Sequence, residues 1–456
     1  MTGLPTACVI GAGSSGIAAL KGLLDRRIPA DCYECGDRVG GNWVFGNRNG
    51  MSAAYRSLHI NTSRERMEYA DFPMPKSYPD FPHHSDIAAY FDAYADRFGL
   101  REHIRFETCV EHAERAADGS WTVRLAGGEE RGYDALLVAN GHHWDPRWPE
   151  PAFPGRFDGM QMHAHEYVDH KPLEGKRVVV LGMGNSAMDI AVESSLVASA
   201  TYLAARRGAH VIPKYVFGKP VDQVLRPDPR IPWRLRQKLF EAILRTQIGR
   251  VEDYGLPKPD HRLGDAHPTI SDQILSRVTH GEIVPKPSIA SLEGDRVRFA
   301  DGSDAEADVI VYCTGYKVTF PFFDEDFISA PGNDLPLFHR VFEPGIPNVF
   351  FVGLLQPLGA IMPLAEAQGR WIASYLRGEY ALPSRAEMEA QMRAERERMF
   401  KRYVPSKRHT MQVDFEEYLQ RLDRERDAGA RRAADRGFPL PVPVSTGGAP
   451  PARAIV

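Results

Sequence analysis

The chain has 456 residues, 43% of them hydrophobic and 25% charged, and its formal net charge is -4 at pH 7. This length exceeds one ordinary hydrophobic core, which predicts a globular protein of two domains, or of one domain interrupted by another. The small net charge gives no reason to expect a nucleic-acid partner, and the longest apolar runs, 178–181 and 349–355, are too short to cross a membrane. Five cysteines and no signal-like start favour the reducing cytoplasm.

The first segment with a readable pattern is a strand, a tight turn and a helix over residues 8–23. Its turn has the spacing G-x-G-x-x-G. Glycines at this spacing let the backbone approach a pyrophosphate, and the N-terminus of the following helix presents amides and a positive dipole end to it. The predicted dinucleotide contacts here are Gly11, Gly13, Ser15 and Gly16.

An acidic residue is expected about 20 residues after such a turn, at the end of the second strand, where it binds a ribose hydroxyl. Glu34 stands there, inside the motif formed by Cys32 and Cys35. Side chains alternate along a strand, so the two cysteines take opposite faces and are badly oriented for a disulfide with each other. No second C-x-x-C completes a zinc site. We therefore expect Glu34 to carry the function and the cysteines to be incidental.

Helix starts and one ambiguous region follow. Ser85 is predicted to cap a helix that Gly99 closes, and Ser384 with Glu387 has the spacing of a capping box. Residues 216–270 are rich in Pro, Arg and His and match neither the helical nor the strand period. They read either as a lid over the nicotinamide or substrate, or as irregular packing.

A second dinucleotide turn follows a buried strand at 178–181, in the form G-x-G-x-x-A. One such motif is weak, but two in one chain, each between a strand and a helix, are far more specific. The predicted contacts in the second turn are Gly182, Gly184, Asn185 and Ser186.

The second unit differs from the first in charge after its next strand. Arg206 and Arg207 stand where the first unit has its acidic residue. Arginines pair with a 2′-phosphate whereas a carboxylate repels it, which predicts NADPH at the second site and FAD at the first. The alternative is a solvated loop that carries two basic residues.

Two similar β-rich stretches flank the second unit. One leads into a strand that ends at Asn140-Gly141, and the other into a strand that ends at Thr314-Gly315. They suit crossings between two nucleotide domains, so we predict an α/β fold with two Rossmann-like domains, the NADPH domain inserted into the FAD domain. The expected bounds are 1–167 and 291–436 for the FAD domain, 168–290 for the NADPH domain and 437–456 for a Pro/Gly-rich tail.

The link between the units reads FDGMQMHAHEY, and its Phe157, Gly159, His163 and Tyr167 have the spacing F-x-G-x-x-x-H-x-x-x-Y. This resembles the identifying sequence of the flavin-containing monooxygenases. The resemblance extends over most of the chain, including the segments GGNW at 40–43, HINTSR at 59–64, TGY at 314–316 and VGLLQPLGAI at 352–361. It implies cofactor contacts at Gly41, Asn42, Trp43, Asn61, Thr62, Thr314, Gly315 and Gln356.

The resemblance also implies the chemistry. NADPH would reduce FAD, the reduced flavin and oxygen would form a C4a-hydroperoxyflavin, and a soft nucleophile, the nitrogen of an amine or the sulfur of a sulfide, would take one oxygen. Asn61 is the one catalytic candidate, because an amide donates and accepts hydrogen bonds at once. Without the family match, Asn61 reads as a turn residue.

Two departures from the family pattern concern the reaction type. Val168 stands where a Lys or Arg usually follows the motif tyrosine, and Ala164 where a Ser is common. The related Baeyer–Villiger enzymes carry Trp-Pro or a close variant where this chain has Tyr167-Val168. The resemblance therefore favours heteroatom oxygenation over ketone oxygenation. A flavin reductase with two dinucleotide sites and a non-catalytic flavin-binding protein are two competing hypotheses.

The resemblance implies a small set of partners. They are an amine, sulfide or ketone substrate and molecular oxygen, with a homodimer as the candidate assembly and neither a nucleic acid nor a membrane. The histidine pairs at 83–84 and 142–143 lack spacing partners, so no metal site is expected.

Overall fold

The computed structural model describes residues 3–225, 230–403, 409–442 and 444. The chain forms two compact units, each assembled from separate stretches of sequence. Unit 1 comprises 1–52, 64–142 and 318–456, and unit 2 comprises 53–63 and 143–317. The predicted tail at 437–456 lies largely outside the described residues.

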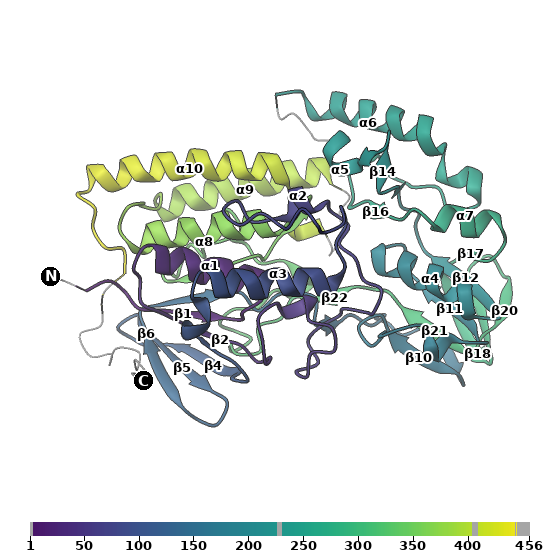
Figure 1. Cartoon of the computed structure of the whole chain (residues 1–456), viewed down its shortest axis with the longest axis horizontal. Helices are drawn as coiled ribbons and strands as arrows, with labels where there is room; N and C mark the ends of the chain where they lie inside the picture. The colour runs from purple at the N-terminus through teal and green to yellow at the C-terminus, as the bar shows by residue number, and fades with distance from the viewer. Residues whose placement is uncertain (1–2, 226–229, 404–408, 443, 445–456) are drawn as a thin grey trace. The chain divides into compact units, whose positions relative to one another are not determined.

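Unit 1 is built on a five-stranded parallel sheet with the order β23-β7-β1-β2-β3. Figure 1 labels its strands β1 and β2. Its strands are β1 Ala7–Ile10, β2 Ala30–Tyr33, β3 Ile104–Arg105, β7 Ala135–Val138 and β23 Val349–Phe351. All residues of β1, β7 and β23 are buried, because a parallel sheet is covered on both faces and its inner strands are therefore apolar throughout.

Unit 1 also contains six α-helices among its described residues. They are α1 Ser14–Asp25, α2 Arg64–Met67, α3 His84–Arg97, α8 Met362–Leu376, α9 Arg385–Arg402 and α10 Phe415–Asp435. Helices α1 and α8 approach closely at two glycines: a Cβ on Gly22 would lie 2.9 Å from the carbonyl carbon of Gly369, and one on Gly369 would lie 2.7 Å from the Cα of Ala19. Small residues at this crossing are a steric requirement.

The predicted helix starts fare differently. The capping box of Ser384 with Glu387 is confirmed at the start of α9. The prediction of Ser85 as a cap is wrong, because α3 begins at His84 and its cap is His83. The His83 side chain accepts from the Ser85 amide, and Asp86 accepts from the His83 amide at 3.1 Å. These bonds satisfy amides at the start of the helix, with the cap two residues before the expected one.

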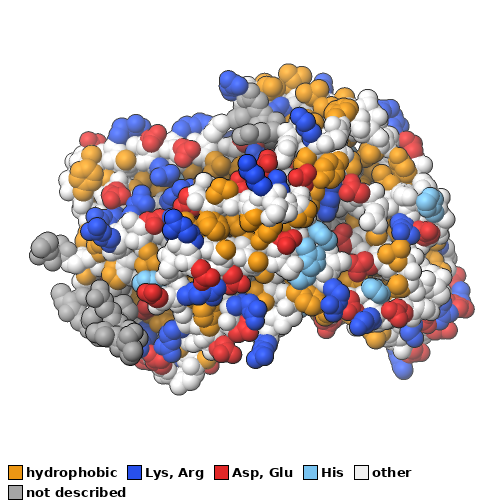
Figure 2. Space-filling view, in the orientation of Figure 1, with side chains coloured by type: hydrophobic (Ala, Val, Ile, Leu, Met, Phe, Trp, Pro, Cys, Tyr) orange, Lys and Arg blue, Asp and Glu red, His pale blue; other side chains and the backbone are white. Residues whose placement is uncertain are grey.

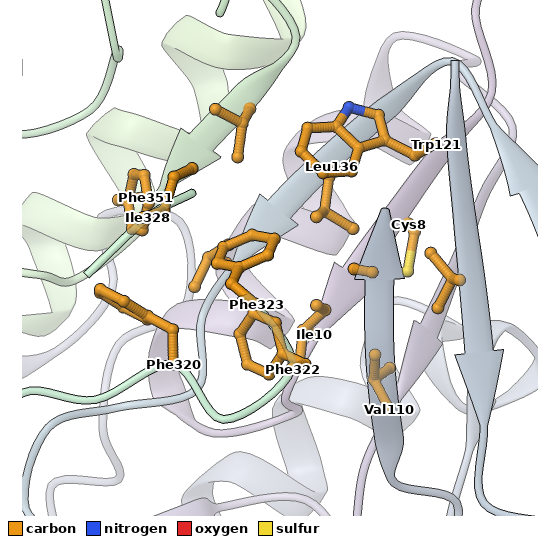
Figure 3. Packing of buried hydrophobic residues seen from close by; sticks show 14 of the residues in the cluster. Cys8, Ile10, Val110, Trp121, Leu136, Phe320, Phe322, Phe323, Ile328 and Phe351 are labelled. Atoms are coloured by element: carbon orange, nitrogen blue, oxygen red, sulfur yellow. The ribbon is translucent and has the colours of Figure 1, made fainter. Parts of the chain in front are cut away.

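A three-stranded antiparallel meander belongs to unit 1: β4 Val110–Arg115, β5 Trp121–Leu125 and β6 Glu130–Tyr133. Its inner face joins the core of the unit, where the rings of Trp121 and Phe323 lie 5.9 Å apart. Figure 3 shows these rings beside Phe322 and the sheet residues Ile10 and Leu136. The β-rich stretch predicted at this point of the sequence is confirmed.

Unit 2 has a second five-stranded parallel sheet, with the order β10-β21-β11-β12-β17. Its strands are β10 Met160–His163, β11 Arg177–Leu181, β12 Ala200–Ala205, β17 Val284–Pro287 and β21 Val309–Tyr312. A smaller sheet in the same unit has the order β20-β19-β18-β9, formed by Asp304–Glu306, Arg296–Phe299, Ile289–Gly294 and Gly155–Phe157. Compact unit 2 thus extends on both sides of the stretch 168–290.

The helices of unit 2 are α4 Asn185–Val197, α5 Val221–Val224, α6 Trp233–Ile248 and α7 Ile274–Thr279. The sequence reading missed α6, a helix of 16 residues inside the region that matched no period. Leu235 and Leu239 lie on this helix with exposed fractions of 60% and 55%, so apolar residues occur on its solvent side as well as its buried side. Leu235, Leu239 and Ile243 nevertheless recur at every fourth position, so the helical period is present in the sequence, within a region whose Pro and Arg content obscured it.

The cysteines are not all incidental. Cys35 forms a disulfide with Cys109, 74 residues further along the chain, while Cys8, Cys32 and Cys313 are free. The expectation that Cys32 and Cys35 do not bond to each other is confirmed. The expectation that both cysteines lack a role is wrong for Cys35 as a structural residue, since its partner comes from a distant segment that spacing rules do not reveal.

Two findings concern the surface and the helices. Figure 2 shows acidic and basic side chains intermixed across the visible face, in keeping with the small net charge. Among the described residues, no helix is long and apolar enough to span a bilayer, and no cluster of three or more His, Cys, Asp or Glu side chains has the arrangement of a metal site.

Candidate cofactor and active site

The first glycine-rich turn lies between β1 and α1, and its backbone is too crowded for larger residues. Gly11 has φ 98°, and a Cβ there would lie 2.7 Å from the Ala139 carbonyl oxygen. A Cβ on Gly16 would lie 1.8 Å from the Gly11 carbonyl oxygen. Gly13 is the N-cap of α1, and no side chain caps it. The first amides of the helix are therefore open to an anion such as a pyrophosphate.

The segment with the sequence GGNW lies directly against this turn. The Gly40 amide donates to the Ala12 carbonyl at 3.0 Å, and a Cβ on Gly41 would lie 3.1 Å from the Cα of Gly13. The following Asn42 and Trp43 form a half-buried single turn of 3₁₀ helix. Two segments that are almost 30 positions apart thus form one surface around the open helix terminus.

Glu34 is buried, with 6% of its surface exposed, at the end of β2. Its Oε2 accepts from the Ala12 amide and its Oε1 from the Gly36 amide, both at 2.7 Å. Burial raises the pKa of Glu34 above its usual range, and the two amides offset part of that rise. An ionised carboxylate has about four acceptor positions, so two remain for the hydroxyls of a ribose. The position and the acceptor count fit the predicted role.

The segment 352–361 also lies at the first turn. A Cβ on Gly353 would lie 2.0 Å from the Ser15 Oγ, and the Gly353 amide donates to the Gln368 Oε1 at 2.8 Å. Gln356 begins β24 Gln356–Leu358, which pairs with β25 Gln412–Asp414. The turn, the GGNW segment, Glu34 and this segment therefore meet within unit 1 at the carboxyl ends of β1 and β2, where ligands of such sheets bind.

The second glycine-rich turn lies between β11 and α4 in unit 2. Gly182 has φ 146°, and a Cβ there would lie 2.7 Å from the Cys313 carbonyl oxygen. Gly184 is the N-cap of α4, and no side chain caps this helix either. Ser186, in the first turn of α4, is half-buried. The open amides at this N-terminus give the second turn the same anion-binding potential as the first.

A short strand holds the second turn in place. This is β16 Thr269–Ile270, whose Ile270 amide donates to the Asn185 Oδ1 at 2.8 Å and whose Thr269 hydroxyl donates to the Met183 carbonyl at 2.5 Å. The sequence reading missed β16, because the region around it matched no period. The positioning of Asn185 therefore depends on a segment more than 80 residues away.

The two arginines after β12 have different surroundings. The Arg207 Nε lies 2.5 Å from the Asp260 Oδ2. His261 and Arg207 together hold the pKa of Asp260 below its usual range. Arg206 is exposed and makes no ion pair with any residue in the described ranges. The geometry therefore leaves Arg206 as the cation available to a ligand.

The segment 53–63, which contains Asn61, belongs to unit 2 and is attached to α4. The Tyr55 hydroxyl donates to the carboxylate of Asp189, and the Tyr167 hydroxyl donates to Glu193 Oε2 at 2.5 Å. The rings of the two tyrosines lie 5.9 Å apart, edge to face. Burial raises the pKa of both carboxyls, and each accepts a hydrogen bond from its tyrosine hydroxyl. Glu193 also accepts from the hydroxyl of Ser57, which lies on the same segment as Tyr55.

A second attachment follows Asn61. The Ser63 amide donates to the Asp222 Oδ2 on α5 at 2.7 Å. Asn61 and Thr62 are half-buried, and within the part of the chain that the structure describes the Asn61 amide makes no hydrogen bond. A side chain on a segment held at both ends, with unused donors and an unused acceptor, is suited to bind a ligand.

The crossing back from unit 2 contains Thr314 and Gly315. The Thr314 hydroxyl donates to the Arg147 carbonyl at 2.5 Å, and the Arg147 amide donates to the Gly315 carbonyl at 2.9 Å. These bonds join the two crossing strands, β8 Asp145–Pro146 and β22 Tyr316–Lys317.

His163 of the link motif is held inside the protein by its neighbours. His163 ends β10 and is fully buried, its Nδ1 accepts from the His165 amide at 3.0 Å, and its ring lies 5.4 Å from that of Tyr316. Desolvation lowers the pKa of His163 to about 4. The folded protein therefore holds this imidazole neutral near pH 7.

The predicted site residues fall into two groups. Those of unit 1 are Gly11, Gly13, Ser15, Gly16, Glu34, Gly41, Asn42, Trp43 and Gln356, and those of unit 2 are Asn61, Thr62, Gly182, Gly184, Asn185, Ser186, Arg206, Arg207, Thr314 and Gly315. Sequence reasoning missed the residues that hold the second group, Asp189, Glu193, Asp222 and Thr269. Only the position of the two acids on the helix that follows the second turn could have indicated them.

Comparison with known proteins adds a family. The family model described as flavin-binding monooxygenase-like matches residues 6–430. A curated relative, flavin-containing monooxygenase 5 of Rattus norvegicus, is 37% identical over 440 residues, which cover 91% of this chain and 81% of the relative.

Solved structures show the same fold. The S-allyl-L-cysteine S-oxygenase of Allium sativum superposes with a TM-score of 0.70 at 25% identity, over 95% of this chain and 92% of that one. The cyclohexanone monooxygenase of Rhodococcus sp. Phi1, solved with NADP⁺ bound, superposes with a TM-score of 0.71 at 18% identity, over 98% of this chain and 100% of that one. An α/β fold with two parallel sheets is thus common to all three.

The buried His163 predicts an acid-dependent loss of stability. Its pKa is lowered to about 4 in the folded state. The unfolded chain therefore binds a proton at this histidine near pH 6.5, whereas the folded chain binds it only near pH 4. Stability conferred by the neutral ring is lost as the pH falls from 6.5 towards 4. Between pH 7 and pH 4.5 this histidine should lower the unfolding free energy of the parent protein by up to about 2.5 kcal/mol. His163→Asn lacks the titrating ring, so its unfolding free energy should fall by that much less over the same range. Urea titrations at the two pH values measure this.

The control for this prediction is His170→Asn, because His170 is a half-exposed member of the same unit. This variant shows the effect of removing a more exposed histidine from the same unit. Parallel pH profiles for His163→Asn and the parent would show that the ring is not held neutral.

Proposed function

The chain belongs to the flavin-binding monooxygenase-like family, and on that premise we propose that it transfers one oxygen atom of O₂ to the nitrogen of a small amine or the sulfur of a small sulfide. It is an oxidoreductase that uses FAD and NADP(H). The observation that carries the proposal is the pair of glycine-crowded turns, one in each unit, each at an uncapped helix terminus. Support for sulfur as an acceptor comes from the S-oxygenase of Allium sativum.

FAD is assigned to unit 1. The amides at the start of α1 would bind its pyrophosphate, Glu34 would accept from the hydroxyls of its adenosine ribose, and the segments at 40–43 and 352–361 would contact the rest. The crowding at Gly11 and Gly16 supports this assignment, because only a bare backbone leaves room for a phosphate there. In this proposal the FAD domain comprises 1–167 and 291–436.

NADPH is assigned to the inserted domain, 168–290. The start of α4 would bind the pyrophosphate and Arg206 the 2′-phosphate. Thr314 and Gly315 lie on the crossing and would contact a cofactor from outside the insert. Arg207 is already paired with Asp260, which supports Arg206 as the dominant contact.

Asn61 is proposed as the catalytic residue. When bound and reduced, the flavin supplies the activation of oxygen. The Asn61 amide would donate a hydrogen bond to the oxygen group to be transferred and accept one from a cofactor amide. Its segment is held by Tyr55 and Ser63, so the amide keeps a fixed place relative to the second turn. Fixed donors stabilise charge without reorganisation during the reaction.

Ketone oxygenation is the alternative reaction. Its support is the fold shared with cyclohexanone monooxygenase, whereas Tyr167 with Val168 departs from the pattern of that class. A flavin reductase is disfavoured, because its redox cysteines would have to lie beside the flavin ring, whereas Cys32 and Cys35 flank Glu34, the residue assigned to the adenosine ribose.

A coupled assay tests the proposed function. The purified holoenzyme, offered a panel of amines, sulfides and ketones, should consume NADPH and O₂ in equal amounts with one oxygen in the product of an amine or sulfide, as read by mass spectrometry. Oxygen-independent NADPH oxidation would identify a reductase instead. Lactone or ester products alone would identify the ketone reaction.

Arg206 and Arg207 predict unequal effects on cofactor choice. Arg206→Ala should raise the apparent KM for NADPH roughly tenfold to a hundredfold, since a charge-assisted hydrogen bond contributes about 1.5–3 kcal/mol, and leave the KM for NADH almost unchanged. Arg207→Ala is the matched control and should have the smaller effect on NADPH. If neither substitution discriminates between the two nucleotides, the 2′-phosphate binds elsewhere.

Asn61 predicts a change in coupling rather than in flavin reduction. Asn61→Ala and Asn61→Asp both lose the amide donor, so each should reduce its flavin with NADPH at near the parental rate but release more hydrogen peroxide and less oxygenated product. Stopped-flow absorbance and peroxide titration measure the two steps separately. Thr62→Ala, at the neighbouring predicted cofactor contact, shows whether the loss of coupling is specific to Asn61. Parental coupling in both Asn61 variants would remove the residue from the reaction.

A further inference from the structure

The Cys35–Cys109 disulfide adjoins the residue assigned to the ribose. Cys35 immediately follows Glu34 at the end of β2, and Cys109 immediately precedes β4. Both are half-exposed, whereas Cys8 and Cys32 are fully buried. A reagent in solution therefore has access to the disulfide that it does not have to the neighbouring buried thiols.

The disulfide closes a ladder that holds the Glu34 backbone. The Glu34 amide donates to the Arg105 carbonyl at 3.0 Å, and the Thr108 amide donates to the Glu34 carbonyl at 2.9 Å. The Glu107 amide donates to the Gly36 carbonyl at 2.9 Å. The segment 34–36 is thus fixed to 105–109 by three backbone hydrogen bonds and one covalent bond.

One position in this ladder is strained. Glu107 has φ 50°, in the left-handed region that residues other than glycine rarely adopt. Such a conformation persists only where its surroundings enforce it. The disulfide, two residues further along, is the strongest constraint on this turn, so its loss would allow 105–109 to relax away from Glu34.

We propose that Cys35 and Cys109 form a redox-modification site that sets how tightly the protein holds the adenosine end of FAD. The inference rests on the proposed role of Glu34 as the ribose ligand. With the disulfide formed, the Glu34 carboxylate is held toward the first turn by the amides of Ala12 and Gly36. When the disulfide is reduced, no covalent bond holds the segment that carries the Gly36 amide against 105–109.

The chemistry is thiol–disulfide exchange. A dithiol reductant attacks one sulfur, and two protein thiols and the cyclic disulfide of the reductant result. In the reverse direction, hydrogen peroxide, the by-product expected of uncoupled turnover, takes two electrons from the two thiols and leaves the disulfide and two molecules of water. In the reducing cytoplasm expected from the cysteine content, the site would be open at rest and would close under oxidising conditions.

The test compares the oxidised and the dithiothreitol-reduced holoenzyme. Differential alkylation and mass spectrometry establish the state of Cys35 and Cys109, and the fluorescence of released flavin gives the FAD dissociation constant. Reduction should raise that constant roughly twofold to tenfold, the range of one weakened hydrogen bond. Cys109→Ser should bind FAD as the reduced parent does, with or without reductant. Cys32→Ser, the matched control, should keep the full response.

A Glu34→Gln variant separates the inference from the assignment it rests on. If Glu34→Gln weakens FAD binding but reduction of the disulfide does not, the assignment of Glu34 to the ribose stands and the redox inference is wrong. If Glu34→Gln binds FAD as the parent does, the ribose assignment is wrong and the inference falls with it. If peroxide does not convert the alkylatable pair to the disulfide, the inference is also wrong. The reduced parent protein lacks the disulfide without any substitution, so the test still gives a result if Cys109→Ser does not fold.

Discussion

Two half-buried carboxylates on α4 organise the candidate active site. Asp189 and Glu193 lie one turn apart on the helix that begins at the second glycine-rich turn, and each accepts a tyrosine hydroxyl. Desolvation penalises a carboxylate that lacks a donor, so these hydroxyls, with that of Ser57 on Glu193, stabilise the attachment to the helix. Through Tyr55 the segment with Asn61 is attached to the helix that would bind NADPH, and through Tyr167 so is the link with the family motif.

The two proposed cofactor turns use the same physical device. In each, a glycine with positive φ lies so close to a neighbouring strand's carbonyl that a Cβ would fall 2.7 Å from the oxygen, at Gly11 in unit 1 and at Gly182 in unit 2. Each turn is followed by a helix whose first amides no side chain caps. In the proposed assignment, the selectivity between the cofactors comes from the end of the next strand, where one unit has Glu34 and the other Arg206.

Local features were predictable and long-range pairings were not. The strand–turn–helix units around Gly11 and Gly182 follow from short-range spacing, as does the strand end at Glu34. The partner of Cys35 lies 74 residues away, and the contacts of the Asn61 segment with α4 span more than 100 positions, so no periodicity reveals either. Helix α6 escaped detection for a different reason: its helical period, at Leu235, Leu239 and Ile243, lies within a region rich in Pro and Arg that gave no clear period as a whole.

The crossing of α1 and α8 has a consequence for protein engineering. Gly22 and Gly369 let the two helices touch backbone to backbone, and α1 starts at the turn assigned to FAD. The placement of that turn therefore depends on the packing of α1 against α8. A directed-evolution library that varies surface loops but keeps these two glycines would preserve the fold around the turn assigned to FAD. Random mutagenesis across the whole chain would instead produce many variants in which α1 and α8 cannot pack and that turn does not form.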